Sequence, residues 1–278
     1  MLSFVYEALS SRVIFGVGCL DKLSAEAERL SVSRALVLST PEQQGTAREV
    51  ADRLGKCSAG LFTEAVMHVP IEIATAATAR VRELDADCCV AVGGGSTTGL
   101  AKAIALTTGL PIIAIPTSYA GSEMTPIWGL TQGGVKKTGR DTCVLPRTVL
   151  YDPALTVTMP PLLSATSGIN SIAHCVEALY AKDANPIISL LAEEGMRAIS
   201  ASLPQVVKQP DSLEARSRLF MGRGWEESRS APWAWRYITS CATRSAGLSI
   251  CRTPRRTPSS YRMHARTMRQ PRRKRSQE

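Results

Sequence analysis

Three features are missing from this 278-residue sequence, and each absence argues against a class of protein. No apolar run approaches the roughly 18 residues of a membrane-spanning helix, and the N-terminus lacks the basic and apolar regions of a signal peptide. The eight cysteines include no C-x-x-C pair, and several lie in apolar runs, as Cys88 and Cys89 do. This usage favours reduced, buried cysteines. We therefore expect a soluble, cytoplasmic protein.

Acidic residues are scarce at one end of the chain. Residues 221–278 hold 14 of the 33 Lys and Arg but only 3 of the 24 Asp and Glu. The formal net charge of +9 therefore arises in this tail, whereas residues 1–220 are slightly acidic. The tail also holds three of the four tryptophans, Trp225, Trp233 and Trp235. The two parts need separate explanations.

Short apolar runs alternate with amphipathic stretches over residues 1–154. Strands are predicted near residues 13–18, 35–38, 60–62, 88–92, 112–115 and 147–151, and helices near 20–30, 48–54, 71–84 and 96–104. This alternation predicts an α/β nucleotide-binding domain with a Rossmann-like parallel sheet. From Leu155 the apolar residues follow only helical periodicity, so residues 155–219 are predicted to begin an all-α domain.

The most informative stretch is the predicted strand 88–92, with Gly93, Gly94 and Gly95 after it. Ser96 or Thr97 is expected to cap the helix that follows. Glycines let a ligand approach the backbone, and the amides at a helix N-terminus suit a phosphate group, although an ordinary strand-to-helix turn has the same pattern. A second small-polar loop, Thr117–Glu123, follows the next strand. Two such loops at the carboxyl ends of neighbouring parallel strands indicate a nucleotide site.

Asn170 and His174 lie four residues apart on a predicted helix, so both side chains share one face, with Glu177 next along it. From the pattern alone, His174 reads more readily as a packing histidine than as a catalytic one. A catalytic role requires that this face meet the nucleotide loops.

Several segments together resemble the iron-containing alcohol dehydrogenase superfamily, and most closely its maleylacetate reductase branch. The resemblance spans residues 4–219 and is carried by Gly93-Gly-Gly-Ser, Pro116-Thr-Ser-Tyr-Ala-Gly-Ser-Glu, Tyr151-Asp-Pro, Gly168-Ile-Asn-Ser-Ile-Ala-His and Glu177-Ala-Leu-Tyr. It implies the dehydroquinate synthase-like architecture of that superfamily, an N-terminal α/β domain followed by a helical domain. It also implies a homodimer.

The resemblance implies a dinucleotide site and a reaction. The residues expected to hold the coenzyme are Gly93, Gly94, Gly95, Ser96 and Thr97 at the pyrophosphate, and Thr117, Ser118 and Ser122 at the nicotinamide ribose. The implied reaction transfers a hydride from NADH or NADPH to the C=C bond of maleylacetate, giving 3-oxoadipate in the catabolism of chlorinated aromatics. The preferred coenzyme stays open, because Ser39-Thr40 lacks the acidic residue that bonds a ribose 2′-hydroxyl.

Asn170 and His174 are the catalytic candidates, and His174 is the donor expected to polarise the substrate ketone. Metal-dependent relatives carry an Asp where this chain has Asn170. An amide oxygen is a weaker ligand for a dication, so no metal is expected. Tyr119, Lys136 and Lys137, with Arg140, are the candidates for binding the dicarboxylate substrate. A metal-dependent alcohol or glycerol dehydrogenase is the alternative within this superfamily.

The resemblance stops near Leu219, and the tail at 220–278 shows neither of the histidine-containing stretches that the family carries there. Read one nucleotide earlier, possible codons for Tyr237–Gly247 encode His-His-Lys-Leu-Cys-His-Thr-Leu-Gly-Gly. Those for Ser249–Thr257 encode Asp-Leu-Pro-His-Ala-Glu-Thr-His. Our hypothesis is that residues 220–278 are an out-of-frame translation, with a largely disordered tail. In that case the chain as written is inactive.

A function of another class takes the tail literally, as a basic arm that binds nucleic acid through phosphates and stacking. Its basic residues follow no defined fold, so this reading is disfavoured, and no membrane partner is expected.

Overall fold

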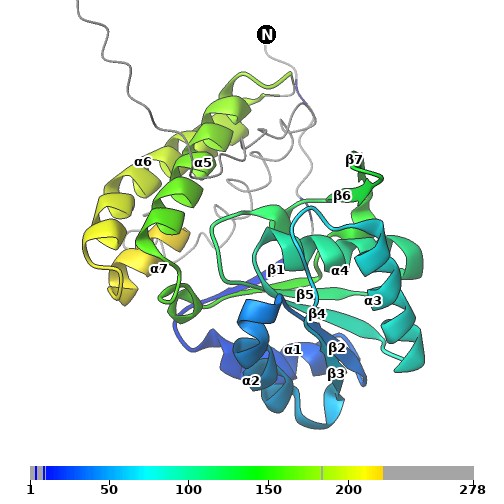
Figure 1. Cartoon of the computed structure of the whole chain (residues 1–278). Coiled ribbons are helices and arrows are strands. Elements are labelled where there is room, and N and C mark those ends of the chain that lie inside the picture. Colours follow the sequence, from blue (N-terminus) through cyan, green and yellow to red (C-terminus); the bar gives the residue numbers. More distant parts are fainter. Residues whose placement is uncertain (1–3, 5–8, 10, 183, 222–278) are drawn as a thin grey trace, which may run out of the picture. The chain divides into compact units, whose positions relative to one another are not determined.

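The computed structural model describes residues 4, 9, 11–182 and 184–221, all of which belong to the first of the chain's two units, residues 1–248. The predicted tail from residue 222 onward, including the frame-shift hypothesis, lies outside the described residues. Figure 1 shows the arrangement of the elements.

A six-stranded parallel sheet forms the centre of the N-terminal part, and it confirms the predicted fold class. Its spatial order is β1-β8-β5-β4-β2-β3. The strands are β1 (Arg12–Phe15), β2 (Ala35–Leu38), β3 (Ser58–Phe62), β4 (Cys88–Gly93), β5 (Ile112–Pro116) and β8 (Thr148–Tyr151). β2, β4, β5 and β8 are buried throughout, as expected for apolar strands covered on both faces.

Helices cover both faces of this sheet (Figure 1). α1 (Leu23–Arg29) and α2 (Gln44–Leu54) pack against Val37 and Val90 on one face. α3 (Ile71–Glu83) and α4 (Gly95–Thr108) pack against Leu36 and Ala91 on the other. Neighbouring residues of each strand therefore enter different cores, because side chains alternate across a strand.

The sequence did not predict the antiparallel hairpin β6 (Ile127–Gln132) and β7 (Val135–Arg140). Its two-residue turn is Gly133-Gly134, with φ values of 55° and 76°. Both residues adopt the left-handed conformation that tight hairpin turns require and that glycine tolerates.

Three helices follow the sheet, α5 (Pro161–Leu179), α6 (Pro186–Lys208) and α7 (Leu213–Met221). Side chains of α6 and α7, including Leu203 and Phe220, join a buried cluster with Val149 and Tyr151 of β8. The helices therefore share a core with strand β8 of the sheet. The boundary at residues 154 and 155 stays a prediction. Over the described residues, no helix combines the length and apolar character needed to cross a membrane.

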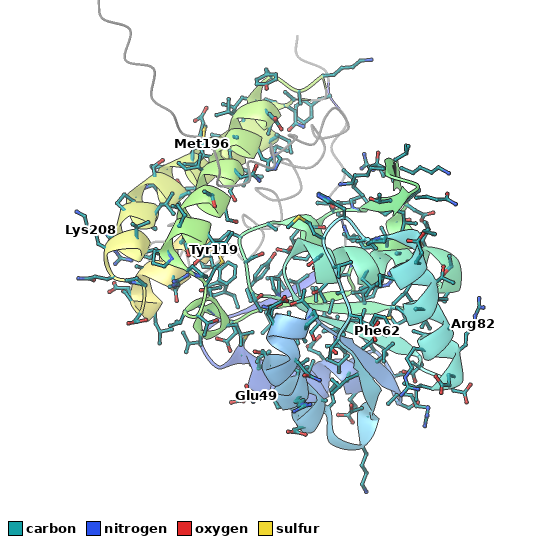
Figure 2. The ribbon with its side chains drawn as sticks, in the orientation of Figure 1. Glu49, Phe62, Arg82, Tyr119, Met196 and Lys208 are labelled. Carbon is teal, nitrogen blue, oxygen red and sulfur yellow. The ribbon has the colours of Figure 1, made fainter. Side chains whose placement is uncertain are left out.

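Polar and charged side chains such as Glu49, Arg82 and Lys208 project outward from the helices (Figure 2). The cysteines at 19, 57, 88, 89, 143 and 175 are free thiols. Burial raises the pKa of Cys89 to about 12 and that of Cys175 to about 11, so both stay protonated near neutral pH.

Candidate functional site

The turn between β4 and α4 places the three consecutive glycines at the carboxyl edge of the sheet. α4 begins at Gly95 and is capped by Gly94, which has no side chain to cap with. The expectation that Ser96 or Thr97 caps this helix was wrong, because the helix starts before either residue. The first turn carries no acidic side chain. Its outward-facing amides and the positive end of the helix dipole therefore suit an anion.

The loop after β5 lies directly against these glycines. The amide of Thr117 donates to the carbonyl of Gly93 at 3.2 Å. A Cβ on Gly94 would come 2.9 Å from Ser118 Oγ, and one on Gly95 would come 3.8 Å from Ala120 Cβ. Residues 93–95 and 117–120 therefore lie directly beside each other at this edge of the sheet.

A buried ammonium holds the far end of this second loop. Lys102 of α4 is 1% exposed, and its Nζ donates to the carbonyls of Ser122, Thr125 and Ile127 at 2.6–2.8 Å. Burial lowers the pKa of Lys102 to about 7, and the charge of Glu123 opposes this shift. The helix that begins at the glycines thus also anchors the loop opposite them.

Glu123 itself lies in the core, 3% exposed, and accepts a 2.7 Å hydrogen bond from the hydroxyl of Tyr151 in β8. Burial raises the pKa of Glu123, although the Tyr151 hydroxyl and Lys102 act in the opposite sense. This carboxyl group therefore joins the second loop to β8 in the interior of the protein.

Helix α5 contacts the second loop through a residue that the sequence analysis did not single out. The hydroxyl of Ser171 donates to the carbonyl of Tyr119 at 3.0 Å. Ser171 is next to Asn170 and one helical turn before His174, so the structure brings this helix to the nucleotide loops. Asn170 is exposed, and His174 is half-buried.

His174 is oriented by its own helix. Its Nδ1 lies 3.2 Å from Glu177 Oε2, an i,i+3 pair with both side chains partly exposed. An imidazole held at Nδ1 by a carboxylate presents Nε2 to other groups. The sequence placed Glu177 on this face, and the structure joins the two side chains.

Tyr119 is buried between the loop and the helices, where Figure 2 labels it. Its hydroxyl accepts a hydrogen bond from Arg216 at 3.2 Å and lies 3.4 Å from Thr156 Oγ1. Its ring also meets Phe220 edge to face. This hydroxyl is engaged by protein groups, and its role toward a substrate stays a prediction.

Comparison with known proteins shows the family to which this chain belongs. The model of the iron-containing alcohol dehydrogenase family matches residues 10–153, and that of the family's C-terminal region matches residues 164–224. The chain belongs to the iron-containing alcohol dehydrogenase family.

Similar members of this family include maleylacetate reductases. The Burkholderia cepacia enzyme of that name is 56% identical over 222 residues, which cover 80% of this chain and 63% of that protein. Crystal structures of maleylacetate reductases from Rhizobium sp. strain MTP-10005 and Agrobacterium tumefaciens match with TM-scores of 0.80 and 0.79. They are 48% and 46% identical and cover 87% and 88% of this chain. This chain spans 66% of each of those two structures. The chain thus spans about two thirds of the length of these relatives.

The family name implies iron, but the described residues do not offer a ligand set for it. Asn170, at the position where metal-dependent relatives carry an Asp, supplies only a neutral amide, and His174 is already paired with Glu177. Across residues 11–182 and 184–221, no three His, Cys, Asp or Glu side chains gather where they could hold a metal ion. The prediction that this chain uses no metal is not tested by this.

The two lysines predicted to bind substrate lie on β7, the second strand of the hairpin. Lys136 packs its stem on Gly129, where a Cβ would come 3.0 Å from Lys136 Cε, and Lys137 donates to Gln132. Both contacts lie within the hairpin, and burial lowers the pKa of Lys136. Arg140 ends the same strand, and all three substrate assignments stay predictions.

Proposed function

We propose that this chain carries the coenzyme-binding part of a maleylacetate reductase. The single observation that supports this most is 56% identity over 222 residues to a protein of that name. Because the chain spans 63% of that protein, the reductase activity itself is part of this proposal.

NADH or NADPH is the proposed coenzyme. Its pyrophosphate would lie at the amides of residues 93–97, where the α4 dipole and the acid-free first turn favour negative charge. Thr117, Ser118 and Ser122 would line the nicotinamide ribose, because their loop adjoins the glycine turn. When bound, the reduced nicotinamide supplies a hydride to the substrate's C=C bond.

The residues of α5 supply the polar chemistry in this proposal. As hydride reaches the conjugated alkene, negative charge builds on the ketone oxygen, and a donor aimed there lowers the barrier. His174 is the proposed donor, with Glu177 orienting its imidazole. Ser171 fixes the helix to the loop beside the nicotinamide half. Lys136, Lys137 and Arg140 are proposed for the two substrate carboxylates.

The test measures NADH oxidation with maleylacetate on the chain as written and on a chain whose reading frame after residue 220 is restored. The proposal expects NADH binding by the restored chain and turnover that a chelator does not reduce. A restored chain that binds neither coenzyme would overturn the proposal. Turnover that depends on added iron or zinc would instead favour a metal-dependent alcohol dehydrogenase.

His174→Asn in the restored chain tests the donor assignment. We expect kcat to fall about 100-fold or more while the Kd for NADH stays within twofold, since general acid catalysis contributes about 10²–10⁴. Unchanged kcat would remove His174 from the chemistry without affecting coenzyme assignment.

A further inference from the structure

One side chain crosses the carboxyl edge of the sheet between the two nucleotide loops. The 3₁₀ turn Pro41–Gln43 follows β2, which is the neighbour of β4, while β5 lies on the other side of β4. Gln43 Nε2 donates to Thr117 Oγ1 at 2.5 Å, so the side chain spans from the loop after β2 to the loop after β5. The sequence analysis did not single out this residue.

Gly93 leaves room for that crossing. A Cβ at this position would come 2.6 Å from Gln43 Oε1 and 2.5 Å from Thr97 Oγ1. Real Cβ atoms do not approach so closely, and the φ of Gly93 is 151°, in a region that other residues rarely adopt. Thus the first glycine of the triplet permits close approach of protein side chains as well as of a ligand.

The polar groups at this crossing are incompletely satisfied. Thr97 is fully buried, and among the described residues its Oγ1 is a buried side-chain oxygen with no hydrogen-bond partner. Buried hydroxyls normally have hydrogen-bond partners. A buried hydroxyl without one marks a place where a further group, such as a ligand or a water, can supply the missing hydrogen bond. This hydroxyl belongs to the first turn of α4, at the proposed pyrophosphate site.

The hydrogen bond from Gln43 also determines what Thr117 can do. A hydroxyl has one hydrogen and can accept as well as donate. Because Thr117 Oγ1 accepts from the Gln43 amide, its own hydrogen remains available for another acceptor. Thr117 is 7% exposed and sits at the start of the loop that adjoins the glycines.

We propose that Gln43 is a positioning residue of the coenzyme site, which fixes the Thr117 hydroxyl as a hydrogen-bond donor to the nicotinamide half of the dinucleotide. This inference rests on the proposed NADH binding. A structural clasp that only joins the loops after β2 and β5 is the competing explanation. The two explanations differ in whether a substitution at Gln43 changes the Kd of NADH alone or also that of ADP. They also differ in whether that change requires the Thr117 hydroxyl.

The experiment measures the Kd of NADH and of ADP, by titration of the full chain, for Gln43→Met and Gln43→Glu. Met keeps the side-chain length without the donor, and Glu can only accept when it is ionised. We expect the Kd of NADH to rise about 3- to 10-fold in both variants, since one neutral hydrogen bond has that effect, while the Kd of ADP stays within twofold. Gln44→Met, at an exposed neighbouring position, is the matched control and should leave both constants unchanged.

A double-mutant cycle with Thr117→Val separates positioning from folding. If Gln43 acts through the Thr117 hydroxyl, Gln43→Met should change the Kd of NADH by less than twofold once that hydroxyl is gone. In Thr117→Ser, which keeps a hydroxyl, the full effect should return. Gln43→Ala serves in place of Met where the Met variant does not fold.

Three outcomes would overturn the inference. The first is an equal rise in Kd for NADH and ADP, which indicates a structural clasp. The second is a wild-type Kd in Gln43→Glu, which means that Thr117 donates to residue 43 and has no hydrogen left to offer. The third is an undiminished effect of Gln43→Met in the Thr117→Val background. Failure of the chain to bind either coenzyme, both as written and with its reading frame restored, would instead refute the proposed function.

Discussion

Substitution of Gly93 by alanine tests the geometry on which the candidate site depends. The added Cβ would lie 2.5 Å from Thr97 Oγ1, 2.6 Å from Gln43 Oε1 and 3.1 Å from Thr97 Cβ. Gln43 can swing away, because its amide is the end of a flexible chain. Thr97 is β-branched and sits in a helix, so its side chain has little freedom to move. The clash with Thr97 therefore dominates.

Two effects set the expected loss of stability for Gly93→Ala. Holding alanine at a φ of 151° costs about 1–3 kcal/mol, as for other residues in sparsely populated backbone regions. Overpacking against Thr97 adds about 1–3 kcal/mol. Together they should lower the free energy of unfolding by about 2–6 kcal/mol, a large fraction of the roughly 5–15 kcal/mol typical of a domain. The Kd for NADH should rise as well, because the turn must shift to relieve the clash.

Urea unfolding of Gly93→Ala, of Thr97→Ala and of the double variant is the assay. Thr97→Ala removes Oγ1, so the double variant should recover the steric part of the loss, about 1–3 kcal/mol, but not the backbone part. Gly45→Ala is the matched control: its Cβ meets nothing within 4 Å, and we expect a gain of up to about 1 kcal/mol in helix α2. A free energy of unfolding for Gly93→Ala within about 0.5 kcal/mol of that of the unmodified chain would refute the reasoning. So would strict additivity of the two single-variant losses in the double variant.

Three further substitutions test the interior around the site. Arg216→Met removes a fully buried guanidinium that donates to five oxygens, and should cost about 3–5 kcal/mol in urea unfolding, whereas Arg218→Met on the same helix should cost under about 1 kcal/mol. Lys102→Met leaves the 122–127 segment without its donor, and should speed proteolysis there at least threefold while far-UV circular dichroism is retained. Burial by itself would raise the pKa of Glu26. Hydrogen bonds from two arginines and a threonine outweigh this effect and lower the pKa below 4.5. Its contribution is therefore present above about pH 4.5 and lost as pH falls through the lower folded value, so Glu26→Gln should cost about 1.5–3 kcal/mol at pH 7 and progressively less below pH 4. A pH-independent difference between Glu26→Gln and the unmodified chain would contradict the assignment.

The sheet could be predicted from sequence because each of its strands has a local signature. Apolar β-branched runs such as Ile112–Ile115 read as buried strands, and glycines or prolines end them. The hairpin β6–β7 was missed because Lys136 and Lys137 make its second strand look like a solvated charge run. The Gly133-Gly134 pair was the available signal, since two adjacent glycines between short segments favour a tight hairpin turn.

The sequence could predict only those parts of the candidate site that are formed by the backbone of the two loops. The glycines at 93–95 and the small residues at 117–122 can be recognised in the sequence as a candidate nucleotide site. Such residues at the ends of adjacent strands are those that the close approach of a ligand would require. Gln43, Ser171 and Arg216 act through side-chain contacts across 52 to 97 residues of sequence, and no local pattern encodes such contacts. Only the arrangement of the strands brings Gln43 beside Thr117, which is 74 residues away.

Helix α7 packs against the loop at residues 117–123 through Tyr119. Arg216 contacts its hydroxyl, and Phe220 contacts its ring with centroids 5.0 Å apart. Phe220 also meets the ring of Tyr151, whose hydroxyl bonds Glu123 beneath the same loop. Both contacts come from α7, so this helix supports the loop that would line the proposed nicotinamide site. A chain ending at residue 211 would lose this support and expose both rings. We expect it to bind NADH at least tenfold more weakly than the full chain in a fluorescence titration, and equal affinity would show that the loop holds its conformation without α7.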